Sequence, residues 1–200
     1  MADPRTLRRS PLVDVDLPKA PAEAAATQRV RLRELPCQAM VGLRLDPEGE
    51  AAEVAGRAIG TALPTLVGEV ASTDTRDVLW LGPDEWLVVS QESPAALMTA
   101  IASPLVGHYA AAVDLSANRT TIELSGPAAR SVLEKGCPAD LHPRVFGPGR
   151  AIVTTIARTP VLLWQTDAET YRIMPRSSLA AYVAAWLADA MLEFNAAELS

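Results

Sequence analysis

The stretch VLWLGPDEWLVVS, residues Val78–Ser90, carries two apolar runs on either side of a polar turn. The runs Val78–Leu81 and Trp86–Val89 are rich in Val, Leu and Trp, which favour strands. Between them stands Gly82-Pro83-Asp84-Glu85, in which Gly tolerates a positive φ, Pro fixes φ, and Asp bonds to its own backbone. The stretch therefore predicts a β-hairpin with a buried face.

On the N-terminal side of this hairpin, the pattern predicts two strands and a helix. Arg29–Leu35 alternates charged and apolar residues, as a half-exposed strand does, and Gln38–Leu45 reads as a second strand. Apolar residues in Glu50–Ile59 recur at helical spacing, and Gly60 is a plausible helix stop. Residues 1–28 contain four prolines, so we expect an extended or disordered arm there.

On the C-terminal side, strands and helices alternate again. Ser93 and Pro94 have the residue types of an N-cap and a first helical position. The further expected elements are a strand at Tyr109–Leu115, a strand at Thr120–Leu124, a helix at Pro127–Lys135, a loop at Pro138–Arg150, a strand at Ala151–Ala157, a hairpin at Val161–Met174, one continuous helix at Ser177–Phe194, and a tail at 196–200.

The order of these elements occurs twice along the chain. A strand with a helix is followed by a hairpin with a helix, first in about residues 29–103 and again in about 108–195. We therefore predict an α+β fold in which one globular domain, residues 29–195, holds two similar halves. Each half has a mostly antiparallel sheet with helices packed on one face.

Composition excludes several classes of function. The net charge of −6 leaves no basic surplus to neutralise nucleic-acid phosphates. The sequence has neither a signal-peptide core at its start nor an apolar run of about 18 residues, so we expect a cytoplasmic protein without a membrane partner. Cys37 and Cys137 form no CxxC pair, and we expect both to be reduced thiols.

No catalytic constellation is recognisable. His108 and His142 are the two histidines, and neither belongs to a nucleophile motif or to a metal-ligand spacing. Gly147-Pro148-Gly149-Arg150 precedes a strand rather than a helix, which excludes a P-loop. Asp114 and Arg119 flank a turn and are interpreted as a stabilising pair. The residues alone thus favour a non-catalytic α+β module, with no catalytic, cofactor-binding or metal-binding residue in this chain.

Two long motifs, in order, resemble one family. They are LWLGPDEWLVV (Leu79–Val89) and VDLSANRTTIELSGPAARSVLEKGCPADLHPRVFGPG (Val113–Gly149), followed by the strand, hairpin and long helix from Ala151 to Phe194. Together they resemble the gamma subunit of heterotetrameric sarcosine oxidase. That resemblance implies a fold similar to the folate-binding domains of aminomethyltransferases.

The resemblance also implies a function in a complex. Such complexes oxidatively demethylate sarcosine to glycine, pass formaldehyde to tetrahydrofolate and release hydrogen peroxide. It implies FAD, FMN, NAD, tetrahydrofolate and zinc on the other subunits, with alpha, beta and delta subunits as partners and no cofactor on this chain. We therefore expect a non-catalytic structural subunit.

Under this hypothesis, exposed motif residues become interface candidates, because aromatic and Arg side chains often anchor interfaces. The tryptophans among them could equally be core residues. Two alternatives stay open: a stand-alone folate-binding or aminomethyl-transferring protein, and a gamma-like subunit of a related N-methyl amino acid dehydrogenase. The interface candidates are Trp80, Asp84, Glu85, Trp86, His142, Arg144 and Phe146.

Overall fold

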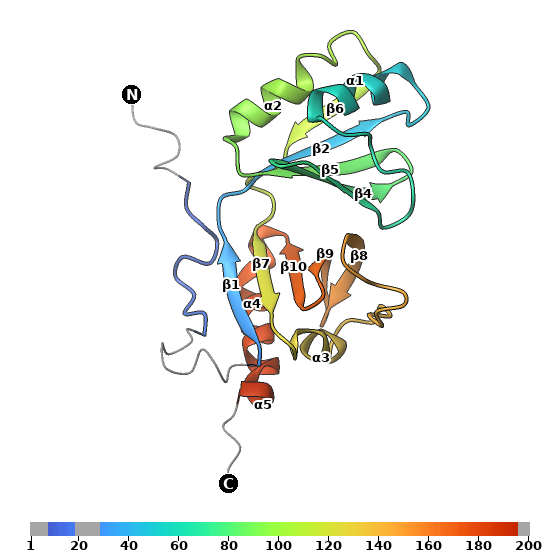
Figure 1. The fold of residues 1–200 in the computed structure, drawn as a ribbon. Helices are drawn as coiled ribbons and strands as arrows, with labels where there is room; N and C mark the ends of the chain where they lie inside the picture. Colours follow the sequence, from blue (N-terminus) through green and yellow to red (C-terminus); the bar gives the residue numbers. More distant parts are fainter. Residues whose placement is uncertain (1–7, 19–28, 196–200) are drawn as a thin grey trace. The chain divides into compact units, whose positions relative to one another are not determined.

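The computed structural model describes residues 8–18 and 29–195, and the chain divides into two compact units (Figure 1). Unit 1 consists of the described parts of residues 1–37, 119–148 and 153–200. Unit 2 consists of residues 38–118 and 149–152. The expected 196–200 tail and most of the expected arm lie outside the described residues.

Unit 2 is a five-stranded sheet covered by two helices. The central hairpin is β4 (Arg76–Gly82) and β5 (Glu85–Ser90), paired antiparallel as the Gly-Pro-Asp turn predicts. Their register shifts between Trp80 and Gly82, which marks a bulge beside the turn. The remaining strands are β2 (Ala39–Leu45), β3 (Val70–Ser72) and β6 (Ala110–Asp114), in the spatial order β3-β4-β5-β2-β6.

The two helices of unit 2 begin and end where the sequence predicts. Helix α1 covers Glu50–Ile59 and ends at Gly60, which adopts a left-handed φ of 98° and donates to the Gly56 carbonyl. Helix α2 covers Pro94–Ala102, and the Ser93 hydroxyl accepts a hydrogen bond from the Ala96 amide at 3.2 Å. Figure 1 shows both helices along the same sheet.

The helix-covered face of this sheet forms one apolar core. Strand alternation directs every second residue of β2 and β5 toward α1 and α2. Fully burying each large apolar side chain stabilises the fold by about 1.5 to 3 kcal/mol. The core comprises Ala39, Val41, Leu43, Leu45, Ala51, Ala55, Ile59, Val78, Trp86, Val88, Leu97, Ile101 and Leu105.

Unit 1 has a second five-stranded sheet, in the order β1-β7-β10-β9-β8. The β1–β7, β7–β10 and β10–β9 pairs are antiparallel, and the expected hairpin is the β9–β10 pair. The two units together confirm the α+β class. The strands are β1 (Arg31–Leu35), β7 (Thr121–Ser125), β8 (Arg150–Ile156), β9 (Thr159–Asp167) and β10 (Thr170–Pro175).

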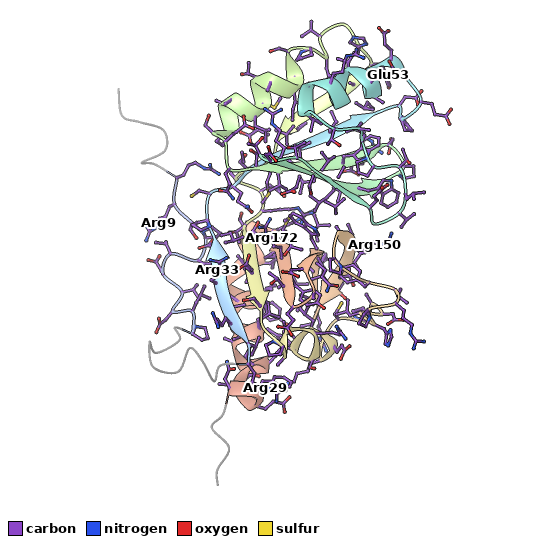
Figure 2. The ribbon with its side chains drawn as sticks, in the orientation of Figure 1. Arg9, Arg29, Arg33, Glu53, Arg150 and Arg172 are labelled. Atoms are coloured by element: carbon purple, nitrogen blue, oxygen red, sulfur yellow. The ribbon has the colours of Figure 1, made fainter. Side chains whose placement is uncertain are left out.

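A charged row crosses the sheet of unit 1. Glu123 of β7 lies opposite Arg33 of β1 and Arg172 of β10, and Arg172 lies opposite Trp164 of β9. Figure 2 labels Arg33 and Arg172 on their strands. The Glu123 carboxylate is nearly buried and accepts from Arg33 Nε at 2.6 Å. The Arg172 guanidinium stacks 4.8 Å from the Trp164 ring centroid. The row connects four strands through ion pairs and a cation–π contact.

The described part of the N-terminal arm packs on unit 1. Leu12 is buried, and the Ser10 hydroxyl hydrogen-bonds to the Glu34 carboxylate of β1. The Arg8 guanidinium donates to the Cys37 carbonyl at 3.0 Å. Residues 8–18 are therefore anchored by one apolar and several polar contacts, which the proline content did not reveal.

Strand pairing departs from the expected halves. Strand β1 joins the sheet of unit 1, where Leu32 lies opposite Leu124. Strand β6 joins the sheet of unit 2, where Val41 lies opposite Asp114. The expected halves were residues 29–103 and 108–195. In the structure, β1 of the first half belongs to the sheet of the second, and β6 of the second half belongs to the sheet of the first. Alternation specifies which side chains of a strand share a face, but it does not specify the partner strand.

The expected continuous helix at Ser177–Phe194 is instead three segments. A 3₁₀ helix covers Ser177–Leu179, α4 covers Ala180–Ala190, and α5 covers Leu192–Asn195. Apolar spacing fits all three, so it does not indicate the interruption at Met191. The short helix α3 covers Ala129–Glu134 and packs against α4. No helix within residues 8–18 and 29–195 is long and apolar enough to cross a membrane.

Candidate partner-docking surfaces

The interface candidates on the β4–β5 hairpin separate into buried and exposed residues. Trp86 is 0% exposed, and its indole Nε1 donates to the Pro64 carbonyl at 2.8 Å. Trp80 lies opposite it and packs, half-buried, against the same core. Trp86 is therefore a core residue, because its large ring fills the space beneath α1. Of the two interpretations left open for Trp86, interface anchor or core residue, its burial favours the core residue.

The turn of the same hairpin remains on the surface. Asp84 is half-buried and Glu85 is exposed. The Arg44 Nε of β2 donates to the Asp84 carboxylate at 3.0 Å, while the Leu45 amide donates to the Asp84 carbonyl at 3.1 Å. The hydrogen bond and the charge of Asp84 raise the pKa of the Arg44 guanidinium above its ordinary value. These contacts fix the turn against the end of β2 and hold its carboxylates at the surface.

A groove opens beside this turn. It has a volume of about 680 Å³, and its walls are the Arg44–Asp84 pair on one side and the start of β6 on the other. Tyr109, immediately before β6, is 97% exposed. Val106, in the same connection, is 82% exposed. The groove is lined by Arg44, Leu45, Asp46, Pro47, Asp84, His108, Tyr109, Ala110 and Ala111.

A second groove of about 590 Å³ lies along α1 and shares Pro47 with the first. Its walls are mainly apolar, with Ala52, Gly56 and Leu63 among them. Glu53, labelled on α1 in Figure 2, forms an ion pair with Arg57 at 3.7 Å, and both residues line the groove. Open apolar grooves of this size are suited to side chains of another protein.

The remaining candidates lie in the Pro138–Arg150 loop of unit 1. His142 and Arg144 are exposed, and the Arg144 amide donates to His142 Nδ1 at 3.2 Å. Phe146 is only 3% exposed. Its amide donates to the His142 carbonyl at 2.9 Å, which closes the turn and directs the ring inward. Phe146 is thus a core residue, in contrast to the expectation, whereas His142 and Arg144 remain available to a partner.

The His, Cys, Asp and Glu side chains of the described residues form no cluster of metal ligands. Within 8–18 and 29–195, no group of three His, Cys, Asp or Glu side chains could hold a metal ion. Cys37 is exposed and Cys137 is buried, and both are free thiols. Asp114 stabilises the turn that follows β6, because its Oδ1 accepts from the Ser116 amide at 2.9 Å, and Arg119 donates to the Met174 carbonyl at 2.9 Å.

Sequence reasoning missed the groove at the start of β6. Its walls come from residues that are distant in sequence, and they meet only because β2 pairs with both β5 and β6. The run His108-Tyr109-Ala110-Ala111 gives one signal, since a lone aromatic residue precedes three alanines at a strand start. That signal identifies no partner residue across the sheet.

A solved aminomethyltransferase has a similar fold. Aminomethyltransferase T of the glycine cleavage system from Bartonella henselae superimposes with a TM-score of 0.63 at 14% identity. The match covers 82% of this chain and 47% of that chain. At such low identity it shows the fold alone, and it confirms the expected aminomethyltransferase-like architecture.

Closer relatives define the family. The model of the sarcosine oxidase, gamma subunit family matches residues 42–193. A sarcosine oxidase subunit gamma from Corynebacterium sp. (strain U-96) is 46% identical over 201 residues, covering 100% of this chain and 98% of the relative. A chain of the heterotetrameric sarcosine oxidase from Corynebacterium sp. U-96, solved in complex with pyrrole 2-carboxylate, matches with a TM-score of 0.84. That match has 43% identity and covers 97% of this chain and 100% of the other.

The chain therefore belongs to the sarcosine oxidase gamma subunit family. A second relative, sarcosine oxidase subunit gamma from Arthrobacter sp., is 45% identical over 190 residues. It covers 94% of this chain and 92% of the relative.

Proposed function

We propose that this chain is a non-catalytic structural subunit of a heterotetrameric sarcosine oxidase that demethylates sarcosine to glycine in the cytoplasm. The observation that carries the proposal is the full-length match to a chain of the Corynebacterium heterotetramer. A match of this coverage and identity is the kind expected between subunits that occupy the same position in related complexes.

The surface of the chain supports an assembly function. One groove lies at the turn end of the unit 2 sheet and the other lies along α1, and Pro47 lines both. Tyr109 and Val106 present large apolar side chains to solvent next to one of them. Exposed apolar side chains beside a groove are typical of surfaces that another protein covers.

The proposed partners are the alpha, beta and delta subunits of that complex. In this proposal FAD, FMN, NAD, tetrahydrofolate and zinc belong to those subunits, and this chain contributes packing surface. Two ionised side chains with little exposure have partners within this chain. The buried Glu123 pairs with Arg33, and the half-buried Arg76 pairs with Glu92 at 2.7 Å.

Affinity purification of the tagged full-length chain from the cells that produce it tests the proposal. We expect larger subunits to co-purify, with flavin absorbance and sarcosine-dependent release of hydrogen peroxide. Titration of the isolated chain with tetrahydrofolate is the matched measurement, and we expect no stoichiometric binding. Purification of the chain alone, together with tight stoichiometric folate binding, would instead establish a stand-alone folate protein.

A further inference from the structure

The outer edge of the unit 2 sheet is formed by β6, which pairs on one side with β2. The Leu115 amide donates to the Met40 carbonyl at 2.8 Å, which fixes the phase of the hydrogen-bond ladder. In an antiparallel pair, bonded and non-bonded positions alternate. Ala111 and Val113 therefore bond to β2, and the amide and carbonyl of Ala112 point away from β2, toward the open edge.

Within the part of the chain that the structure describes, β6 carries no Lys, Pro or bulge that would block strand addition. Natural edges are commonly blocked by Lys, Pro, a bulge or a covering loop. Strand β6 reads Ala-Ala-Ala-Val-Asp, with a regular register against β2 and one charged residue at its end. Val113 is 53% exposed on the strand, and Tyr109 is 97% exposed immediately before it. The edge thus offers backbone groups that point away from β2 and exposed apolar side chains.

The charge of unit 2 determines what could add to this edge. Residues 38–118 and 149–152 contain eleven Asp and Glu residues against four arginines, which is a net charge of −7. The remainder of the chain therefore carries +1 of the total of −6. Asp46, Glu48, Asp84 and Glu85 belong to the two turns at one end of the sheet, and Asp46 and Asp84 line the groove that starts at β6. Arg44 offsets part of this charge.

We propose that β6 accepts an extended, basic segment of a larger subunit, which adds as a sixth strand to the unit 2 sheet. Backbone bonds to Ala112 set its register, and an apolar side chain of the segment occupies the groove beside Tyr109. Basic side chains of the segment face Asp46, Asp84 and Glu85, since strand addition takes affinity from the backbone and specificity from side-chain pockets. This inference rests on the proposed function and specifies the docking site within it.

Photo-crosslinking in the assembled complex identifies the occupant. Tyr109 is replaced by a photoreactive phenylalanine in the tagged full-length chain, and cross-linked peptides are identified by mass spectrometry. A basic peptide from a larger subunit is the expected product. A peptide from a second copy of this chain, an acidic peptide, or no cross-link in an intact flavin-containing complex would overturn the inference while leaving the proposed function standing.

Substitution at the edge tests the backbone contact. Ala112→Pro removes an amide that points toward the open edge and leaves the bonds to β2 in place, whereas Ala112→Ser keeps the amide. We expect Ala112→Pro to weaken retention of the larger subunits by about tenfold or more, and Ala112→Ser to leave it unchanged. Equal retention by the two variants contradicts strand addition at β6. Because the proline could perturb folding, the melting temperature of each variant is compared, and the cross-link at position 109 decides the case independently.

Substitution of the acidic turn tests the charge of the occupant. Glu85→Gln should reduce the dependence of complex dissociation on salt, since it removes one charge facing the basic segment. Glu134→Gln, on an exposed position of α3 in unit 1, is the matched control and should keep the wild-type salt dependence. The same salt dependence in both variants would exclude a basic segment at this turn. If the wild-type chain captures no other subunit at all, the proposed function fails as well.

Discussion

Replacement of Trp86 by alanine should severely destabilise unit 2. The side chain is fully buried beneath α1, and its indole donates to the buried Pro64 carbonyl. Loss of a buried Trp side chain costs about 3 to 5 kcal/mol of unfolding free energy. The orphaned carbonyl would cost about 1 to 3 kcal/mol by itself, so the value should lie at the upper end of the first range.

Two further variants separate volume from hydrogen bonding. Trp86→Phe keeps most of the apolar volume and removes the indole donor, so we expect a loss of about 1 to 3 kcal/mol. Tyr109→Ala changes a side chain that is 97% exposed, and we expect a change within about 0.5 kcal/mol. Tyr109 is therefore the control for the general effect of removing an aromatic ring.

Native-state hydrogen exchange of β5 peptides is the appropriate assay, because it reports the stability of unit 2 separately from unit 1. Trp86→Ala should lower the free energy of opening of these peptides by the stated amount. If it lowers that value by less than about 1 kcal/mol, the ring does not support the core and the assignment of Trp86 as a core residue is wrong.

Three other predictions concern a titrating ion pair, a glycine and a helix contact. The hydrogen bond from Arg76 lowers the pKa of Glu92, so its stabilisation is present above pH 4.5 and is lost as pH falls through the lowered folded value. Glu92→Gln should therefore destabilise the chain at neutral pH and converge with wild type in acid melts. Gly126 has a φ of 118°, and a Cβ there would lie 2.6 Å from the Arg29 carbonyl oxygen, so Gly126→Ala should cost about 1 to 3 kcal/mol in urea unfolding. A Cβ at Gly136 would lie 2.5 Å from the Trp186 ring, so Gly136→Ala should lower the melting temperature, and Trp186→Leu should partly restore it by making room. A difference in stability between Glu92→Gln and wild type that stays the same at every pH would contradict the first prediction. An unchanged urea midpoint for Gly126→Ala would contradict the second. A melting temperature of Gly136→Ala that Trp186→Leu does not raise would contradict the third.

The sequence predicts correctly those helices and strands whose bounds are determined by residues within the same short segment. Helix α1 has the expected bounds because apolar spacing, a first-turn Glu and a left-handed Gly60 all act within one short segment. The β4–β5 hairpin likewise follows from its own turn residues. Ser93 caps α2 because its hydroxyl reaches an amide three residues later.

Nonlocal pairing was not predictable in the same way. The exchange of β1 and β6 between the sheets depends on which of several similar alternating strands provides the better partner. The interruption of the C-terminal helix has the same origin. The Asn195 side chain accepts from the Val30 amide at 3.2 Å and donates to the Val30 carbonyl at 2.9 Å, a contact between residues 165 positions apart in the sequence.

The interface candidates show why the sequence alone does not separate surface residues from core residues within a motif. The family motif contains buried and exposed residues in adjacent positions, such as Glu85 and Trp86 on one strand. Motif membership therefore grouped Asp84 and Glu85, which lie at the surface, with Trp86 and Phe146, which lie in the core. Tyr109 has no part in the quoted motifs, although it is among the most exposed aromatic side chains described.

Native mass spectrometry of the complex that contains the tagged full-length chain tests the central claim most directly. We expect an assembly of four different polypeptides that contains one copy of this 21.2 kDa chain and holds flavin on the larger subunits. A species that contains this chain alone, as a monomer or as a homo-oligomer without flavin, would contradict the assignment of the chain as a subunit of a heterotetrameric sarcosine oxidase.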